Sequence, residues 1–301
     1  RLTLGTVQLG MLYGIANKSG QPDEQVCKQV LDQAVNGGIV SFDTAQGYGS
    51  SETVLGRYFG GNSDFTIISK FTMDLDPCSS ETEIESYLTE KIEGSLERLK
   101  LKQIPVMMLH HASDLLKYGR KLTKACDSLI RIGYVQKLGV SFGADPVSVS
   151  REIWLLARDP VFEAIQVPIN ALDHRLLASG LLQEMSEADK IIFARSIFLQ
   201  GLLFLETDEI PARLQGAAPF LSRLRQIAEQ EGMTLPELAV AFVRDLPQIS
   251  SIVVGVETPG QIEKNLVWFN CPAISEHTRS EIAEVAADMS ELVISPHLWN
   301  G

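Results

Sequence analysis

The sequence contains no run of apolar residues long enough to cross a membrane as a helix. Its most apolar stretch, residues 191–205, is interrupted by Arg195, Ser196 and Gln200 and is shorter than the roughly 20 residues that a bilayer requires. Basic residues are also scarce, because 26 Lys and Arg stand against 38 Asp and Glu, giving a formal net charge of −12. Without a basic patch to neutralise phosphates, we expect neither nucleic acid nor an anionic membrane surface as a partner.

Cysteine is scarce as well. The four cysteines, Cys27, Cys78, Cys126 and Cys271, lie far apart, without the spacing of a metal site or a disulfide framework. We therefore expect free thiols, no metal centre and a reducing, cytoplasmic location. Nothing in the sequence fixes the oligomeric state beyond a monomer or a small homo-oligomer.

What the sequence does contain is a regular alternation of short apolar runs with amphipathic stretches. Parallel strands covered by helices have continuous apolar runs of this kind. No G-x-G-x-x-G pattern follows a predicted strand, which disfavours an open dinucleotide-binding sheet. We therefore predict a single (β/α)8 barrel domain over residues 1–301, a normal length for that fold. The predicted strands are Leu2–Thr6, Ile39–Asp43, Phe65–Lys70, Val106–His110, Val135–Ser141, Ala164–Val167, Ile191–Arg195 and Ser251–Val254. The predicted helices are Glu24–Asn36, Glu83–Leu99, Ser113–Ile132, Val147–Ala157, Leu221–Glu231 and Leu235–Arg244.

Ionisable residues follow three successive predicted strands. Asp43, Lys70 and His110 end the second, third and fourth strands, and Tyr48 lies in the loop after Asp43. Each alone has an ordinary explanation, such as a turn former, a solvated strand end or a packed ring. Because active sites of (β/α)8 barrels lie at the C-terminal ends of the strands, the four together favour a catalytic group.

This combination of residue types suits the reduction of a carbonyl group. Hydride addition places negative charge on the carbonyl oxygen, which then needs a proton donor and electrostatic stabilisation. Tyr48 is a possible donor, although the ordinary pKa of tyrosine is near 10. A nearby ammonium such as Lys70 favours the phenolate, and Asp43 could hold that ammonium in place.

The sequence around these residues resembles the aldo-keto reductases, from the first strand almost to the C-terminus. The resemblance implies an NAD(P)H-dependent reductase of aldehydes or ketones with Tyr48 as general acid. It assigns Lys70 and Asp43 as the pair that tunes Tyr48, and His110 as the group that orients the substrate. The stretches that carry the resemblance are Leu4-Gly5-Thr6, Ser41-Phe42-Asp43-Thr44-Ala45, Tyr48-Gly49, Ser51-Glu52, Ile68-Ser69-Lys70, Met108-Leu109-His110, Leu138-Gly139-Val140-Ser141 and Ile165-Gln166-Val167 with Asn170.

The same resemblance implies residues for the nicotinamide half of the cofactor. Gly5, Thr6 and Asp43 correspond to positions near the nicotinamide ribose. Ser141 and Gln166 correspond to residues that hold the carboxamide.

The region around the seventh strand departs from the family pattern. Many members have asparagine after the carboxamide-binding serine, where this sequence has Phe142, so one polar contact is missing or moved. Arg195 and Ser196 occupy the place where the family stacks a planar side chain on the nicotinamide. A guanidinium can stack there, and the alternative is a rim arginine in a salt bridge. The residues that resemble the pyrophosphate-facing loop are Phe198, Gln200, Gly201 and Leu202.

The segment from Val253 to Pro259 resembles the adenosine end of the site. NADP-preferring members generally place Lys or Arg there, whereas this sequence has Glu257 and Gln261. A carboxylate repels a 2′-phosphate and accepts a hydrogen bond from a free 2′-hydroxyl, so we expect weakened NADP preference and use of NADH. The alternative is that Glu257 is solvated and that Lys264 supplies a positive charge. The candidate residues of this end are Gly255, Glu257, Thr258, Gln261 and Asn265.

The substrate side is the least defined by sequence. Residues 5–17 resemble bacterial family members associated with surface-polysaccharide biosynthesis, which implies a sugar-type carbonyl. Tyr13, His111 and Trp299 are candidates for lining the substrate pocket. The alternatives for the three are loop packing, packing behind a strand, and a tail aromatic that covers the barrel.

Two other functions compete with the reductase. One is a regulatory barrel that binds the nucleotide with little turnover, which the complete set of four residues disfavours. The other is a metal-dependent hydrolase that uses Asp43, His110 and His111. Because adjacent residues of a strand point to opposite faces, we expect that the two histidines do not share one metal.

Overall fold

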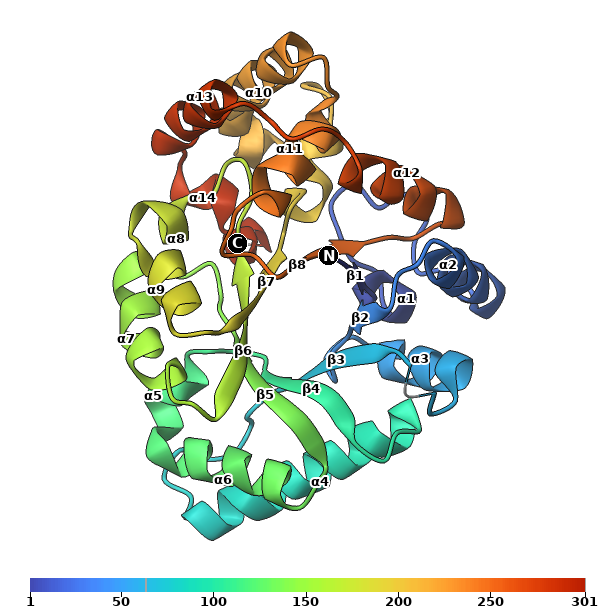
Figure 1. The fold of residues 1–301 in the computed structure, drawn as a ribbon, viewed down its shortest axis with the longest axis vertical. Helices are drawn as coiled ribbons and strands as arrows, with labels where there is room; N and C mark the ends of the chain where they lie inside the picture. The colour runs from blue at the N-terminus through green and yellow to red at the C-terminus, as the bar shows by residue number, and fades with distance from the viewer. Residues whose placement is uncertain (63, 301) are drawn as a thin grey trace.

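The computed structural model describes residues 1–62 and 64–300 and shows a closed barrel of eight parallel strands ringed by helices (Figure 1). The strands pair in sequence order, and β8 closes the barrel against β1 with Val254 opposite Leu4. The predicted (β/α)8 barrel is confirmed. The strands are β1 (Leu2–Gly5), β2 (Ser41–Asp43), β3 (Thr66–Phe71), β4 (Ile104–Leu109), β5 (Val135–Ser141), β6 (Phe162–Pro168), β7 (Ile191–Arg195) and β8 (Ser251–Gly255).

The strands are rich in apolar residues because both of their faces are largely buried. In β4, Val106 and Met108 belong to a small cluster inside the barrel. Met107 and Leu109 belong to the large core between the strands and the helices. This is the two-residue alternation of a strand, and it explains why each predicted strand has a continuous apolar run rather than a polar–apolar pattern.

Several helices begin at capping residues that the sequence displays. The side chain of Asp23 accepts from the backbone N–H of Val26 at the start of α2 (Glu24–Asn36). Ser80 and Glu83 form a reciprocal capping box at the start of α4 (Glu81–Leu99), which satisfies backbone donors that no helical bond can reach. The other predicted helices found by the structure are α7 (Val147–Ala157), α10 (Ala218–Gln230) and α11 (Leu235–Arg244).

The predicted single helix Ser113–Ile132 is wrong. It is two helices, α5 (Asp114–Tyr118) and α6 (Arg120–Arg131), separated by Gly119 with a φ of 54°. An α-helix cannot continue through a left-handed φ, and only glycine adopts this one without strain. The helical segments that the sequence pattern did not reveal are α1 (Val7–Gly10), α3 (Ser51–Phe59), α8 (Arg175–Ala178), α9 (Leu181–Glu187), α12 (Pro259–Phe269), α13 (Glu276–Ala287), α14 (Glu291–Ile294) and the 3-10 turns η1 (Leu199–Phe204), η2 (Ala212–Ala217) and η3 (Pro296–Asn300).

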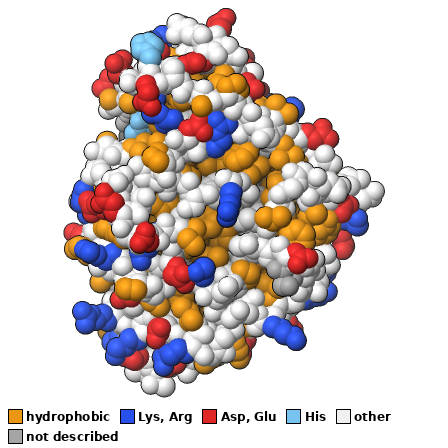
Figure 2. Space-filling model, viewed as in Figure 1, with side chains coloured by type: hydrophobic (Ala, Val, Ile, Leu, Met, Phe, Trp, Pro, Cys, Tyr) orange, Lys and Arg blue, Asp and Glu red, His pale blue; other side chains and the backbone are white. Residues whose placement is uncertain are grey.

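The surface carries charges of both signs around its margin. In Figure 2, acidic and basic side chains are interspersed near the edges, while apolar side chains gather toward the middle of the face shown.

Within the described part of the chain, no helix combines the length and the apolar content needed to cross a bilayer. All four cysteines are free thiols, and only Cys78 is exposed.

Candidate active site

The register of β2, β3 and β4 brings the predicted catalytic residues together. Asp43 is the last residue of β2 and lies opposite Ile68 of β3. Lys70, two residues further along β3, lies opposite Met108 of β4, and His110 directly follows the end of β4. Three neighbouring strand ends therefore deliver a carboxylate, an ammonium and an imidazole to one rim of the barrel.

Lys70 and Asp43 form a fully buried ion pair. The Lys70 Nζ donates to Asp43 Oδ1 and Oδ2 at 2.8 and 2.7 Å and to the carbonyl oxygen of Thr44 at 2.9 Å. The Lys70 side chain is 1% exposed. Gln166 of β6 donates from Nε2 to Asp43 Oδ1 at 2.7 Å, and Ser141 of β5 donates to Gln166 Oε1 at 3.4 Å. All three ammonium protons of Lys70 have acceptors. Lys70 therefore affects the neighbouring Tyr48 through its charge and not through a hydrogen bond.

Tyr48 packs between Lys70 and His110. The Lys70 Nζ lies 5.0 Å from the centroid of the Tyr48 ring. The ring of His110 meets that of Tyr48 edge-on, with centroids 5.5 Å apart and planes at 83°. The backbone of Tyr48 is fixed by Gly10, since a Cβ at residue 10 would lie 1.9 Å from the Tyr48 carbonyl oxygen. The phenol thus has a fixed place beside an ammonium and an imidazole.

His110 is held in its neutral form. Burial, the Lys70 charge and His111 lower the pKa of His110 to about 3. Its Nδ1 is buried without a hydrogen-bond partner, so one ring nitrogen needs no proton. The neutral imidazole keeps a single N–H donor.

His110 and His111 do not point to opposite faces, although adjacent residues of a strand would. The two rings stack with centroids 5.0 Å apart and planes at 7°, and both histidines line the same cavity. The expectation failed because β4 ends at Leu109, so strand alternation does not extend to the pair. Among the residues that the structure describes, no three His, Cys, Asp or Glu side chains come together as a metal-binding group.

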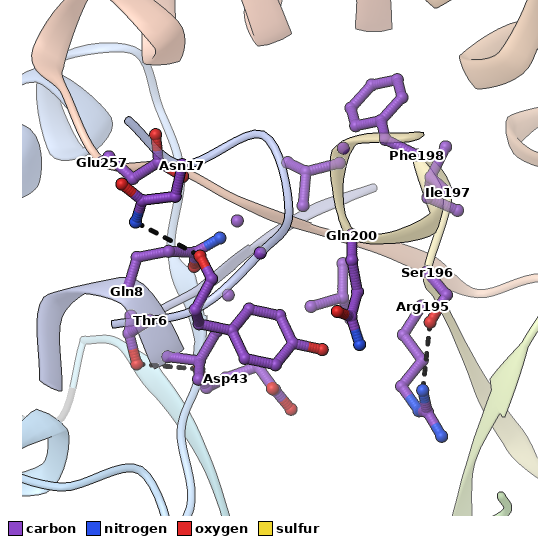
Figure 3. Close-up of a pocket in the computed structure, with 18 of the residues that line it drawn as sticks. Thr6, Gln8, Asn17, Asp43, Arg195, Ser196, Ile197, Phe198, Gln200 and Glu257 are labelled. Atoms are coloured by element: carbon purple, nitrogen blue, oxygen red, sulfur yellow. Dashed lines mark hydrogen bonds between the residues drawn. The ribbon is translucent and has the colours of Figure 1, made fainter. Parts of the chain in front are cut away.

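A cavity of about 540 Å³ runs from these residues across the barrel mouth to α12. Figure 3 shows Thr6 and Asp43 on one side of it, Arg195 and Ser196 on the other, and Gln200 between them. Four predicted residues do not line the cavity: Lys70, Leu202, Thr258 and Trp299. The indole of Trp299 is 1% exposed and donates to the Leu292 carbonyl oxygen at 2.8 Å, so it packs inside the C-terminal segment. The predicted residues that line the cavity are Gly5, Thr6, Tyr13, Asp43, Tyr48, His110, His111, Ser141, Gln166, Arg195, Ser196, Phe198, Gln200, Gly201, Gly255, Glu257, Gln261 and Asn265.

Among the residues that the structure describes, Arg195 at the end of β7 has no salt-bridge partner. Its guanidinium donates to the Phe142 carbonyl oxygen at 2.8 Å and to Ser196 Oγ at 3.0 Å. The Phe142 side chain itself is completely buried in the core. Residue 142 therefore contributes its backbone carbonyl oxygen rather than a side-chain amide. Arg195 donates a hydrogen bond to that oxygen.

The loop after β7 meets the loop after β1 over the cavity. The Ile15 N–H donates to the Gln200 carbonyl oxygen at 3.0 Å. Gln200 has a φ of 52° and Gly201 a φ of 96°. A side chain on Gly201 would collide with Ala16, because its Cβ would lie 2.5 Å from that of Ala16. Because the two loops approach each other so closely, residues from both line the same cavity.

At the other end of the cavity, Glu257 and Gln261 hold each other. Gln261 Oε1 accepts from the Glu257 N–H at 2.6 Å and from the Thr258 N–H at 3.2 Å, while Gln261 Nε2 donates to Glu257 Oε2 at 3.3 Å. Thr258 serves as the N-cap of α12. Lys264 also lines this end of the cavity. The Glu257 carboxylate and the Lys264 ammonium, the two alternatives that the sequence offers, are therefore both present there.

Sequence reasoning missed the aromatic residues of this end. Phe204 and Trp268 line the cavity, with ring centroids 5.7 Å apart and planes at 26°. Phe198 meets the Trp268 ring edge-on at 5.6 Å. Phe204 comes from an irregular turn and Trp268 from the last turn of α12, so no periodicity marked them as neighbours.

Comparison with known proteins identifies the family of the chain. The family model of the aldo/keto reductase family matches residues 1–287. The L-glyceraldehyde 3-phosphate reductase of Escherichia coli O157:H7 is 23% identical, over 95% of this chain and 90% of that protein. An aldo-keto reductase of Bacillus halodurans in its holo form superposes with a TM-score of 0.75 at 19% identity, covering 96% of this chain and 93% of that one. The glycerol dehydrogenase of Gluconobacter oxydans superposes with a TM-score of 0.70 at 21% identity, covering 95% and 91%. The chain therefore belongs to the aldo/keto reductase family and is an NAD(P)H-dependent oxidoreductase.

Proposed function

We propose that the protein reduces a sugar-type aldehyde or ketone to the alcohol, with Tyr48 as the general acid. The observation that carries this proposal is the position of Tyr48. It lies in the cavity wall, with the Lys70 ammonium 5.0 Å from its ring and a neutral imidazole against its edge.

The residues along the cavity fit a nicotinamide dinucleotide. Polar groups that suit a carboxamide, Ser141 and Gln166, lie at the catalytic end. Gln8 Oε1 is buried in the same wall without a hydrogen-bond partner, as expected of an acceptor that meets a bound molecule. Phe204 and Trp268 offer apolar ring faces at the far end, where an adenine could stack.

When bound, the nucleotide supplies the hydride that reduces the carbonyl carbon. Tyr48 donates its hydroxyl proton to the carbonyl oxygen as negative charge develops there. The Lys70 charge favours the phenolate that remains, and Asp43 holds Lys70 in place by accepting from its Nζ. His110, neutral because of its lowered pKa, donates its single N–H to the same oxygen and fixes the direction of the C=O bond.

We also propose NADH as the favoured nucleotide. Glu257 lines the adenosine end of the cavity, and its carboxylate is positioned by Gln261. A carboxylate in that place accepts from the ribose 2′-hydroxyl of NADH and repels the 2′-phosphate of NADPH. The sugar-type substrate is supported by two relatives, which are named for glyceraldehyde 3-phosphate and for glycerol, and by the resemblance of residues 5–17.

A carbonyl panel with NADH and NADPH tests the proposal. The wild type should reduce short sugar aldehydes, and Tyr48→Phe should lose at least about a hundredfold in kcat, the contribution of a positioned general acid. NADH affinity, measured by fluorescence titration, should change little in Tyr48→Phe. Tyr134→Phe is the matched control, since that phenol bonds Glu93 on the surface. A wild type that binds the nucleotide but reduces no carbonyl would instead identify a regulatory nucleotide-binding barrel.

A further inference from the structure

The catalytic end of the cavity contains one cation without a counter-ion. Lys70 is neutralised by Asp43 at 2.7 Å. Arg195 also lines the cavity, but its hydrogen bonds go to a carbonyl oxygen and a hydroxyl. Within residues 1–62 and 64–300, no carboxylate forms an ion pair with it. In a chain with a net charge of −12, a half-buried guanidinium without a counter-ion is suited to binding an anionic ligand.

The other ionisable groups of the cavity do not supply that charge. Glu257 lies on the opposite side of the cavity from Arg195 in Figure 3. Burial raises the pKa of Tyr13, so Tyr13 remains a neutral hydroxyl. His110 is neutral as well, because burial lowers its pKa to about 3. The positive charge of Arg195 is therefore available to a ligand.

The guanidinium lines the same cavity as the proposed reacting groups. It extends from the end of β7 past β6 to the Phe142 carbonyl oxygen, which follows the end of β5. Tyr48 and His110 lie across the cavity, at the ends of β2 and β4. Because both side chains line this cavity, a small substrate whose carbonyl oxygen contacts Tyr48 can present its far end to Arg195.

We propose that Arg195 binds an anionic group, a phosphate or a carboxylate, on the far end of the carbonyl substrate. The inference rests on the proposed reductase function and adds a class of substrate to it. Two of the five guanidinium N–H groups are used by Phe142 and Ser196, which leaves three donors for an anion.

This role is compatible with contact between Arg195 and the nicotinamide. A guanidinium stacks through its planar face and donates hydrogen bonds through its edge. One side chain can thus contact the ring and bind the substrate anion beside it. A tyrosine at residue 195 keeps a planar face but removes the charge, which separates the two roles.

The test compares matched pairs of substrates that differ in charge. Glyceraldehyde 3-phosphate is compared with glyceraldehyde, and succinic semialdehyde with butanal, so that the two pairs distinguish phosphate from carboxylate. For the wild type, the charged member of the favoured pair should have the lower KM. Arg195→Tyr should raise the ratio of the charged to the neutral KM by about tenfold or more, as expected when a charge-assisted hydrogen bond is lost. Arg195→Lys should retain most of the preference.

Several outcomes would overturn the inference. One is a charged-to-neutral KM ratio that is the same in the wild type and in Arg195→Tyr. Another is Arg195→Tyr weakening NADH binding in fluorescence titrations while the ratio stays unchanged, which would assign Arg195 to the nucleotide alone. Arg223→Gln, whose ion pair with Glu281 lies outside the cavity, should leave the ratio unchanged. If the wild type reduces no member of either pair or of the wider carbonyl panel, the proposed reductase function fails, and the inference fails with it.

Discussion

The two ends of the cavity are built in different ways. At the catalytic end, Asp43 and Lys70 lie within regular strands, are nearly inaccessible and are joined by several hydrogen bonds. At the adenosine end, Glu257 follows the end of β8 and is held by a single glutamine at the start of α12. The strands position the proposed reacting groups, whereas a loop and a helix start position the groups proposed to select the nucleotide. Changes at the first end should therefore affect both folding and turnover, and changes at the second should affect selectivity alone.

The largest effect is expected from Lys70→Met, which leaves the Asp43 carboxylate buried without a cation. Removing one partner of a buried pair costs about 3–5 kcal/mol of unfolding free energy, which chemical denaturation measures. Turnover should fall at the same time, because the charge beside Tyr48 is lost. Lys91→Met is the control, since its ion pair with Asp74 is at the surface and 3.5 Å long, worth about 1 kcal/mol or less.

The double variant Asp43→Asn/Lys70→Met sharpens this prediction. It removes both charges, so it should recover a large part of the lost stability while remaining inactive. A Lys70→Met protein as stable as the wild type would contradict the view that the catalytic pair also supports the fold.

A smaller effect is expected from Glu257→Arg at the other end. The ratio of NADPH to NADH affinity should rise by about tenfold, because a guanidinium meets the 2′-phosphate that the carboxylate repels. Unfolding free energy and kcat should change little. Glu263→Arg makes the same charge change on α12, at a residue that bonds Gln33 outside the cavity, and should leave the ratio unaltered. Equal shifts in the two variants would mean that general charge, and not Glu257, sets the preference.

The last prediction concerns pH. The pKa of His110 is lowered to about 3 and that of His174 to about 4, in both cases mainly by burial. In the unfolded chain each titrates near 6.5, so the unfolded state binds more protons between that value and the folded pKa. Stability should therefore fall as the pH is lowered from about 6.5 towards 4, by at most about 1.4 kcal/mol per pH unit for each histidine.

Denaturation midpoints at a series of pH values check this expectation. His174→Phe should reduce the pH slope, because His174 stacks on Phe242 with centroids 4.6 Å apart and a phenyl ring can replace it. His277→Phe should leave the slope unchanged, since His277 is 85% exposed. Equal slopes in the wild type and in His174→Phe would exclude His174 as a source of acid sensitivity.

The sequence predicted the barrel and the catalytic end because both depend on local patterns. Apolar runs of strand length mark β5 and β7, whose bounds were predicted to the residue. Residues at strand ends such as Asp43 and Lys70 can be identified once the barrel is assumed. The sequence failed where one residue interrupts a continuous pattern, as at the left-handed Gly119 inside an otherwise helical stretch.

The adenosine end was only partly predictable for the same reason. Trp268 and Phe204 come from segments more than sixty positions apart, and their proximity depends on how α12 packs over the barrel mouth. Trp299 was expected at the pocket but its indole is buried in the C-terminal segment. A sequence pattern cannot tell an aromatic residue that lines a cavity from one that fills the core.

The contact between Gly10 and Tyr48 has a consequence for engineering the enzyme. Because a Cβ at residue 10 would overlap the Tyr48 backbone, a substitution there would move the phenol from a position outside the catalytic group. Met11, Leu12 and Tyr13 are exposed, and no such overlap restricts their side chains. Libraries that aim to change substrate range can therefore vary residues 11–13 freely, while residue 10 has to stay glycine.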